Sequence, residues 1–166
     1  MRAADPYRDL DVIDSRAPRF NQATIGLLSA VAVLTGAWWL LALLALQLVV
    51  GLTFGRRYCL PCLAYFEIVQ RIFGEGRLED SRPPRFANMV GAAVLGAAAV
   101  LWALGFETAG AVLGGLVTAL ALVAAVTGFC TGCEAYKLGS LLVGRPFVSC
   151  PLPPQPPRER ELRSAP

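Results

Sequence analysis

Two Cys-x-x-Cys motifs hold the residues of this chain that are best suited to chemistry. Cys59 and Cys62 lie in "RYCLPCLAYF", and Cys130 and Cys133 lie in "GFCTGCEAYK". Two thiols at this spacing can exchange disulfides or carry sulfane sulfur, and thiolates are also ligands of zinc and of iron–sulfur clusters. The chain contains no histidine, so a metal site would need thiolate or oxygen ligands.

The residue types leave three interpretations of these four cysteines open. In the first, the pairs are catalytic redox dithiols or persulfide carriers, and the protein is a thiol-disulfide oxidoreductase. In the second, Cys59, Cys62, Cys130 and Cys133 meet and hold one zinc ion or iron–sulfur cluster in a non-enzymatic protein. In the third, they are only small residues at the membrane interface of a scaffold protein.

A helix is predicted directly after the first pair. Pro61 suits the first turn of a helix because it lacks an amide hydrogen, and Gly74 suits the helix end. Between these two residues, apolar side chains recur at helical spacing with polar side chains opposite them. This pattern is typical of an amphipathic helix that lies in a membrane interface.

The position of this helix predicts the reactivity of the first pair. Cys59 would precede the helix N-terminus, and Arg56 and Arg57 stand beside it in the sequence. Helix amides and cations lower the pKa of a thiol, so we expect Cys59 to be an exposed thiolate and Cys62 to resolve its mixed disulfide. The second pair has the mixed neighbours Glu134 and Lys137. This difference fits a relay partner of a reactive first pair, and it fits equally two pairs that are only ligands.

The distribution of charge predicts an all-α integral membrane protein. Hydrophobic residues make up 55% of the 166 residues and charged residues only 16%. No charged residue occurs between Arg19 and Arg56, between Arg85 and Glu107, or between Glu107 and Glu134. Uncharged runs of this length indicate helices that cross a lipid bilayer. The net charge is only +3, and the sequence contains no basic patch of the kind that binds nucleic acid.

A repeat organises the chain. "DSRAPRFNQ" begins at Asp14 and "DSRPPRFAN" begins at Asp80, and each leads into an apolar region that ends in a CxxC motif. The shared order of two motifs indicates an internal duplication. The predicted domains are a polar N-terminal segment (1–13), repeat 1 (14–79), repeat 2 (80–147) and a disordered, proline-rich tail (148–166) that contains Cys150 as a spare thiol.

Each repeat should contain two transmembrane helices, giving four in two helical hairpins, each followed by a short CxxC helix. One helix over residues 20–55 would be roughly 54 Å long, against about 30 Å of hydrocarbon. We therefore expect a turn near "TGAWW". The second hairpin is predicted at 88–104 and 110–128, with "GFETAG" as its turn.

The cationic residues set the orientation and offer a second candidate site. All 15 Lys and Arg residues would lie on the side of both termini and both CxxC pairs, which places these in the cytoplasm. Arg16, Arg19, Arg82 and Arg85 in the repeated motif would anchor the helices at lipid phosphates. Alternatively, they gather around the cysteines as a binding site for a sulfur oxyanion or thiolate.

Two segments, "RFANMVG" and "GFCTGCEAYKLG", resemble the bacterial membrane protein family named domain of unknown function 4395. The resemblance covers roughly residues 10–145, and Cys130, Gly132, Cys133 and Tyr136 carry its most specific part. It implies a multi-pass protein of the bacterial cytoplasmic membrane. Members resemble partners of thioredoxin-like and thiosulfate-sulfurtransferase proteins, so a soluble partner of this kind is expected.

Overall fold

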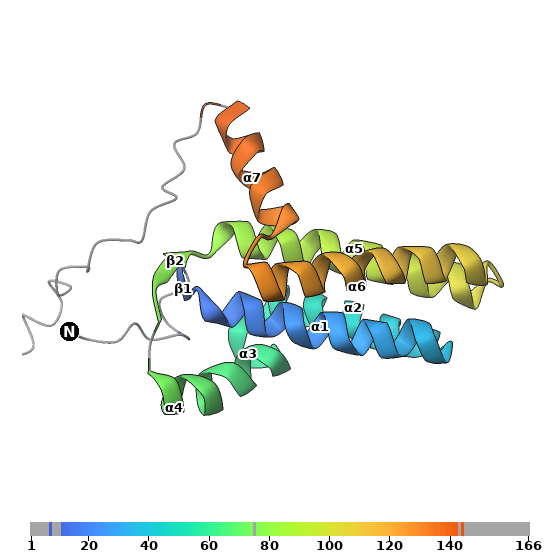
Figure 1. The fold of residues 1–166 in the computed structure, drawn as a ribbon, viewed down its shortest axis with the longest axis horizontal. Coiled ribbons are helices and arrows are strands. Elements are labelled where there is room, and N and C mark those ends of the chain that lie inside the picture. The colour runs from blue at the N-terminus through green and yellow to red at the C-terminus, as the bar shows by residue number, and fades with distance from the viewer. Residues whose placement is uncertain (1–6, 8–10, 75, 143, 145–166) are drawn as a thin grey trace, which may run out of the picture.

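The fold is a bundle of four long helices with shorter elements at one end (Figure 1). A computed structural model describes residues 7, 11–74, 76–142 and 144. In chain order the elements are β1 (Val12–Asp14), α1 (Arg16–Thr35), α2 (Trp38–Phe54), the 3-10 turn η1 (Arg56–Tyr58), α3 (Leu60–Ala64), the π-helical turn η2 (Tyr65–Val69), α4 (Gln70–Phe73), β2 (Leu78–Asp80), α5 (Arg82–Ala103), α6 (Glu107–Thr127) and α7 (Thr131–Leu142).

The first long apolar run is divided between α1 and α2, with the turn where the sequence predicts it. Gly36 follows α1 with φ of 72°, and its amide donates to the carbonyl of Ala32. A left-handed backbone conformation at this position ends a helix. Glycine adopts it at little cost because it has no Cβ. The chain then reverses into α2 at Trp38.

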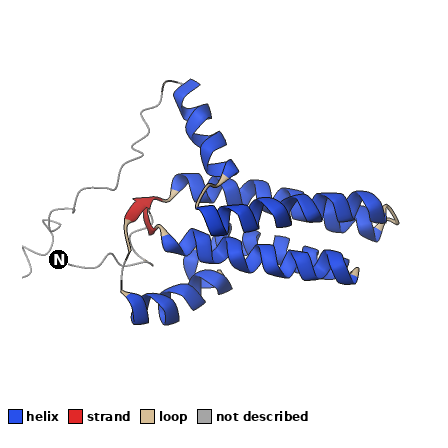
Figure 2. Ribbon diagram, in the orientation of Figure 1, coloured by secondary structure: helices blue, strands red, loops and turns tan. Residues whose placement is uncertain are grey.

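Two short strands, which the sequence did not predict, join the two halves of the chain. β1 and β2 pair antiparallel, with Val12 opposite Asp80 and Asp14 opposite Leu78 (Figure 2). The ladder continues into the helix starts, since the amide of Ser15 donates to the carbonyl of Arg77 at 2.8 Å. The predicted all-α architecture is thus confirmed, and the chain contains one small sheet in addition to its helices.

The aspartates of the repeated motif cap the helices that follow them. Asp14 Oδ1 accepts a hydrogen bond from the amide of Arg16 at 2.9 Å, and Asp80 Oδ1 accepts one from the amide of Arg82 at 2.8 Å. A carboxylate at this position satisfies an amide that has no partner within its own helix. The motif therefore forms a strand end and a helix start in both places.

Each long helix of the first half packs along one of the second half. α1 lies along α6, α2 lies along α5, and α5 also packs against α6. Small side chains let these helices approach closely. The buried core consists of Ile25, Ala32, Leu41, Leu44, Ala45, Leu48, Ala92, Leu95, Ala98 and Ala99.

Large apolar side chains also cover the outside of the bundle. In the part of the chain that the structure describes, α5 and α6 are long and apolar enough to cross a membrane, whereas the apolar helix α2 is shorter. Only 22% of the apolar window of α5 and 17% of that of α6 is buried. Exposed large side chains of the four long helices include Leu27, Val31, Leu34, Trp39, Leu43, Leu46, Val90, Val100, Val112, Leu116 and Val123.

The predicted helix after Cys59 is present as the continuous helical segment 60–73. Its buried residue Tyr65 donates a hydrogen bond to Asp14 Oδ2 at 2.9 Å, and the amide of Gly76 donates to the same oxygen at 2.9 Å. Burial, followed by the hydrogen bond to Asp14, raises the pKa of Tyr65, so the phenol remains a neutral donor. This bond fixes the segment to the start of α1.

Candidate functional site

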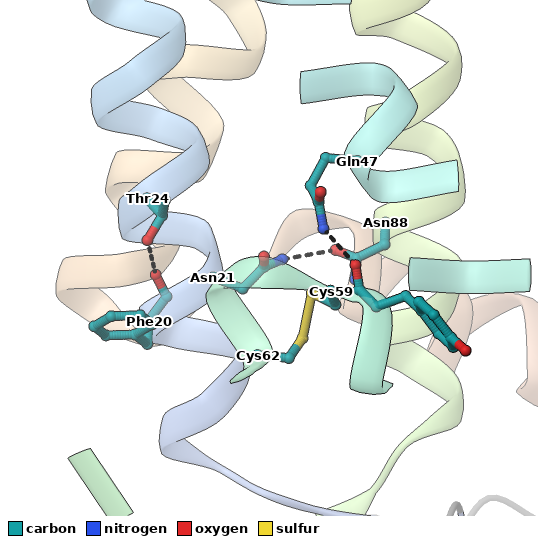
Figure 3. The surroundings of a disulfide bond; sticks show 8 residues. Phe20, Asn21, Thr24, Gln47, Cys59, Cys62 and Asn88 are labelled. Carbon is teal, nitrogen blue, oxygen red and sulfur yellow. Dashed lines mark hydrogen bonds between the residues drawn. A yellow bond between two sulfur atoms is a disulfide. The ribbon is translucent and has the colours of Figure 1, made fainter. Parts of the chain in front are cut away.

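The first CxxC pair lies in the turn between η1 and the helical segment 60–73 and forms a disulfide (Figure 3). Cys59 stands at the N-cap position, since its carbonyl accepts the amide of Leu63 at 2.8 Å. Gln47 Nε2 holds the turn by donating to the carbonyl of Tyr58 at 3.0 Å. A Cβ added to Gly51 would lie 3.0 Å from the Cβ of Cys59, so α2 passes directly behind the disulfide.

The prediction that Cys59 is the exposed thiolate is wrong. The Cys59 residue is only 5% exposed, and its sulfur is bonded to Cys62. The guanidinium of Arg57, which should have stabilised a thiolate, instead lies 5.2 Å from the centre of the Tyr7 ring. The sequence places Arg57 close to Cys59, but in the fold its guanidinium lies over Tyr7 and the Cys59 sulfur is buried, so Arg57 does not stabilise a Cys59 thiolate.

The second CxxC pair is reduced and stands at the start of α7. The Cys130 carbonyl accepts the amide of Glu134 at 3.0 Å, which makes Cys130 the N-cap residue. Cys130 and Cys133 are both free and half-buried. The two thiols are thus three residues apart at a helix N-terminus, the arrangement in which one thiol donates a hydrogen bond to the other and the backbone amides reinforce it.

Hydrogen bonds separate the acidities of these two thiols. The Cys133 thiol, together with the side chain of Gln22 and the backbone amides of Cys133 and Gly132, donates to Cys130 and lowers its pKa to about 6 despite partial burial. The hydrogen bond to Cys130 and burial raise the pKa of Cys133. At neutral pH Cys130 is therefore a thiolate and Cys133 a thiol, which is the division of roles that disulfide exchange requires.

Neighbouring elements hold this pair tightly. A Cβ added to Gly132 would lie 2.8 Å from the Cβ of Ala87 and 3.0 Å from its Cα, so only glycine lets α7 begin this close to α5. The guanidinium of Arg19 lies against Gly128, two residues before Cys130. Arg19, one of the four arginines of the repeated motif, therefore lies near the second CxxC pair.

The other arginines of the repeated motif have different surroundings. Arg82 forms an ion pair with Asp80, with Nη2 and Oδ2 separated by 2.9 Å. This contact agrees with a helix-capping role for the motif. An anion-binding role for Arg16 and Arg85 stays a prediction.

A metal centre made from both pairs is not assembled. Among the residues that the structure describes, no group of three or more His, Cys, Asp and Glu side chains lies close enough to hold an ion. Cys59 and Cys62 are also bonded to each other, so their thiolates are not available as ligands. The donor set therefore does not fit the zinc or iron–sulfur alternative. Cys150 and the predicted tail lie outside the described residues.

A cavity of about 250 Å³ opens beside Cys130, and the sequence did not reveal it. Asn21, Gln22, Asn88 and Cys130 line it at the end where α1 and α5 begin, and apolar residues of α1, α2, α5 and α6 line the rest. Asn21 Nδ2 donates to Asn88 Oδ1 at 3.3 Å (Figure 3). Uncharged amides beside long apolar runs were the signal that could have indicated this site.

The fold and site define a class: a helical protein with apolar outer surfaces, one oxidised CxxC pair and one reduced pair of unequal acidity. The chain belongs to the family described as Domain of unknown function (DUF4395), whose family model matches residues 13–140. Comparison with curated proteins and with solved structures gives no match.

Proposed function

We propose that the protein is a four-span protein of the bacterial cytoplasmic membrane and a thiol-disulfide oxidoreductase that acts through Cys130 and Cys133. Its soluble partner is a thioredoxin-like or sulfurtransferase protein on the cytoplasmic side. The observation that carries the proposal is the reduced CxxC pair at the N-terminus of α7, in which hydrogen bonds hold Cys130 as the thiolate.

The outer surface of the bundle supports the membrane location. All four long helices carry exposed large apolar residues, and apolar area on this scale on a soluble protein would cause association. The repeat supports two hairpins of equal orientation, with the cysteines and the cationic residues on one side. The positive-inside rule places that side in the cytoplasm.

The exchange reaction follows from the acidities of the two thiols. The Cys130 thiolate attacks one sulfur of the partner's disulfide, that S–S bond breaks, and the partner's other sulfur leaves as a thiolate. The negative charge that raises the pKa of Cys133 disappears when Cys130 enters the mixed disulfide. Cys133 can then lose its proton and attack the Cys130 sulfur, so the partner leaves reduced and Cys130 is bonded to Cys133. The reverse sequence oxidises the partner.

Trapping the mixed disulfide tests this proposal. In the purified chain, a Cys133→Ser variant should accumulate one glutathione on Cys130 when treated with oxidised glutathione at pH 7, as measured by peptide mass. Cys130→Ser should accumulate much less on Cys133, because burial still raises the pKa of Cys133 and the hydrogen bonds from Gln22 and the backbone amides act on position 130. Equal labelling of the two variants would contradict the assigned roles. With a persulfide donor, one added sulfur atom on Cys130 would instead favour sulfane-sulfur relay.

A further inference from the structure

The cavity beside Cys130 has a polar end and an apolar length. Its lining residues on α6 run from Leu116 to Ala124, which corresponds to about 12 Å along a helix. Polar side chains gather where Cys130 and Thr131 begin α7. A volume of about 250 Å³ is just below the usual range of small-molecule sites, about 300–1,000 Å³, so it suits a ring and the first atoms of a chain.

One polar atom in the cavity wall lacks a partner. Asn21 is 4% exposed, and within the described part of the chain its Oδ1 accepts no hydrogen bond. A buried acceptor without a donor destabilises the fold until a bound group supplies the hydrogen bond. Its amide nitrogen donates one hydrogen bond to Asn88, and Oδ1 would be completed by a ligand that presents a donor such as a hydroxyl.

We propose that this cavity binds a lipid-soluble quinone, which accepts the electrons of the Cys130–Cys133 dithiol. This inference rests on the proposed function. A quinone supplies what the cavity requires: an apolar tail for the α6 wall, a ring that reaches the sulfur, and, once reduced, a hydroxyl that donates to Asn21 Oδ1. A lipid acyl chain has the apolar length but no donor for Asn21. The oxidised quinone presents only acceptor oxygens, so the hydrogen bond to Asn21 Oδ1 forms with the quinol and favours reduction of the bound ring.

Reduction of the quinone takes two electrons and two protons. The Cys130 thiolate adds to a carbon of the quinone ring, and the ring takes up the electron pair. Cys133 loses its proton and attacks the Cys130 sulfur, so that an S–S bond forms and the S–C bond breaks. The ring leaves as the quinol with two protons, one from Cys133 and one from water, and the dithiol is oxidised by two electrons. A soluble dithiol partner would then reduce the new disulfide by exchange.

The experiment uses the full-length reduced protein in detergent, with decylubiquinone as the probe. Its ring is fully substituted, so a stable thioether does not form. The loss of quinone absorption and the formation of the Cys130–Cys133 disulfide, measured by peptide mass, should proceed one to one. Ala121→Phe fills the cavity, whereas Ala119→Phe makes the same change on an exposed position of α6 and serves as the control.

We expect Ala119→Phe to reduce the quinone like the original chain and Ala121→Phe to lose most of this rate. Both should exchange with 5,5′-dithiobis(2-nitrobenzoate) at the original rate. Asn21→Leu is a second variant: it removes a hydrogen bond made with the quinol, so it should weaken inhibition of the reaction by added quinol about tenfold.

Three results would overturn the inference. Unchanged quinone reduction in Ala121→Phe, together with unchanged inhibition by quinol in Asn21→Leu, would place the quinone elsewhere. Active exchange with the nitrobenzoate disulfide but no quinone reduction in any form would remove the quinone and leave the proposed function standing. Failure of both reactions would remove the proposed function as well.

Discussion

The acidity of Cys130 is the most direct test of the site, because one hydrogen-bond donor is its largest single cause. The Cys133 thiol is the largest cause of the lowering of the Cys130 pKa from 9.0 to about 6. Cys133→Ala removes that donor and leaves the backbone amides and Gln22 in place. The pKa of Cys130 should therefore rise toward 9, because burial, which raises it, opposes the remaining hydrogen bonds.

The alkylation rate at pH 7 should change less than the pKa. Raising the pKa from about 6 to about 9 lowers the thiolate fraction from about nine-tenths to about one-hundredth, roughly ninetyfold. The more basic thiolate is also more nucleophilic, by about twentyfold for a Brønsted coefficient of about 0.45. The net decrease is about fourfold, so the midpoint of the pH profile is the better measurement.

Iodoacetamide alkylation of Cys130, followed by peptide mass between pH 5 and 10, gives this midpoint. We expect it near pH 6 in the original chain, well above this in Cys133→Ala, and still low in Cys133→Ser, whose hydroxyl keeps a donor. A midpoint near pH 9 in the original chain would refute the reasoning. So would a midpoint that is the same in the Ala and Ser variants.

Further predictions test the elements that hold the site and the orientation of the bundle. Tyr65→Phe should lower the free energy of unfolding by about 1–3 kcal/mol, because Asp14 loses a buried hydrogen-bond donor, and it should lower the Tm by a few degrees in detergent. Tyr58→Phe changes an exposed tyrosine and should leave the Tm unchanged. Gly132→Ala should move the start of α7 and raise the alkylation midpoint, whereas Gly139→Ala, with open space around it, should leave both unchanged; equal midpoints would contradict the tight contact. In intact cells, a membrane-impermeant maleimide should leave the second CxxC pair unlabelled until the cells are opened, and labelling from outside would reverse the topology.

The helices could be predicted from the sequence because their signals are local. Charge-free runs marked the long helices, and Gly36 marked the turn that divides the first run. Pro61 and Gly74 marked both ends of the segment after the first CxxC pair. Each of these signals depends on the backbone preference or the hydropathy of neighbouring residues.

The chemistry of the site could not be predicted in this way, because it depends on distant parts of the chain. Cys59 is buried by α2, where Gly51 leaves room for it. Cys130 receives a hydrogen bond from Gln22, more than a hundred positions earlier in the chain. The pairing of Asp14 with Leu78 in the small sheet likewise joins two segments whose individual sequences predicted only the beginnings of helices.

The packing of each long helix of the first half on a helix of the second half affects how the chain folds during synthesis. α1 packs mainly on α6 and α2 mainly on α5, whereas α5 and α6 also have an extensive contact with each other. When a ribosome has delivered only the first half, α1 and α2 have little surface to share, and β1 has no strand to pair with. The first half must therefore wait for the second during synthesis, and only completion of α6 lets α1 take its place. A chain interrupted after α4 would lack both helices on which α1 and α2 pack and would be left as an unassembled hairpin.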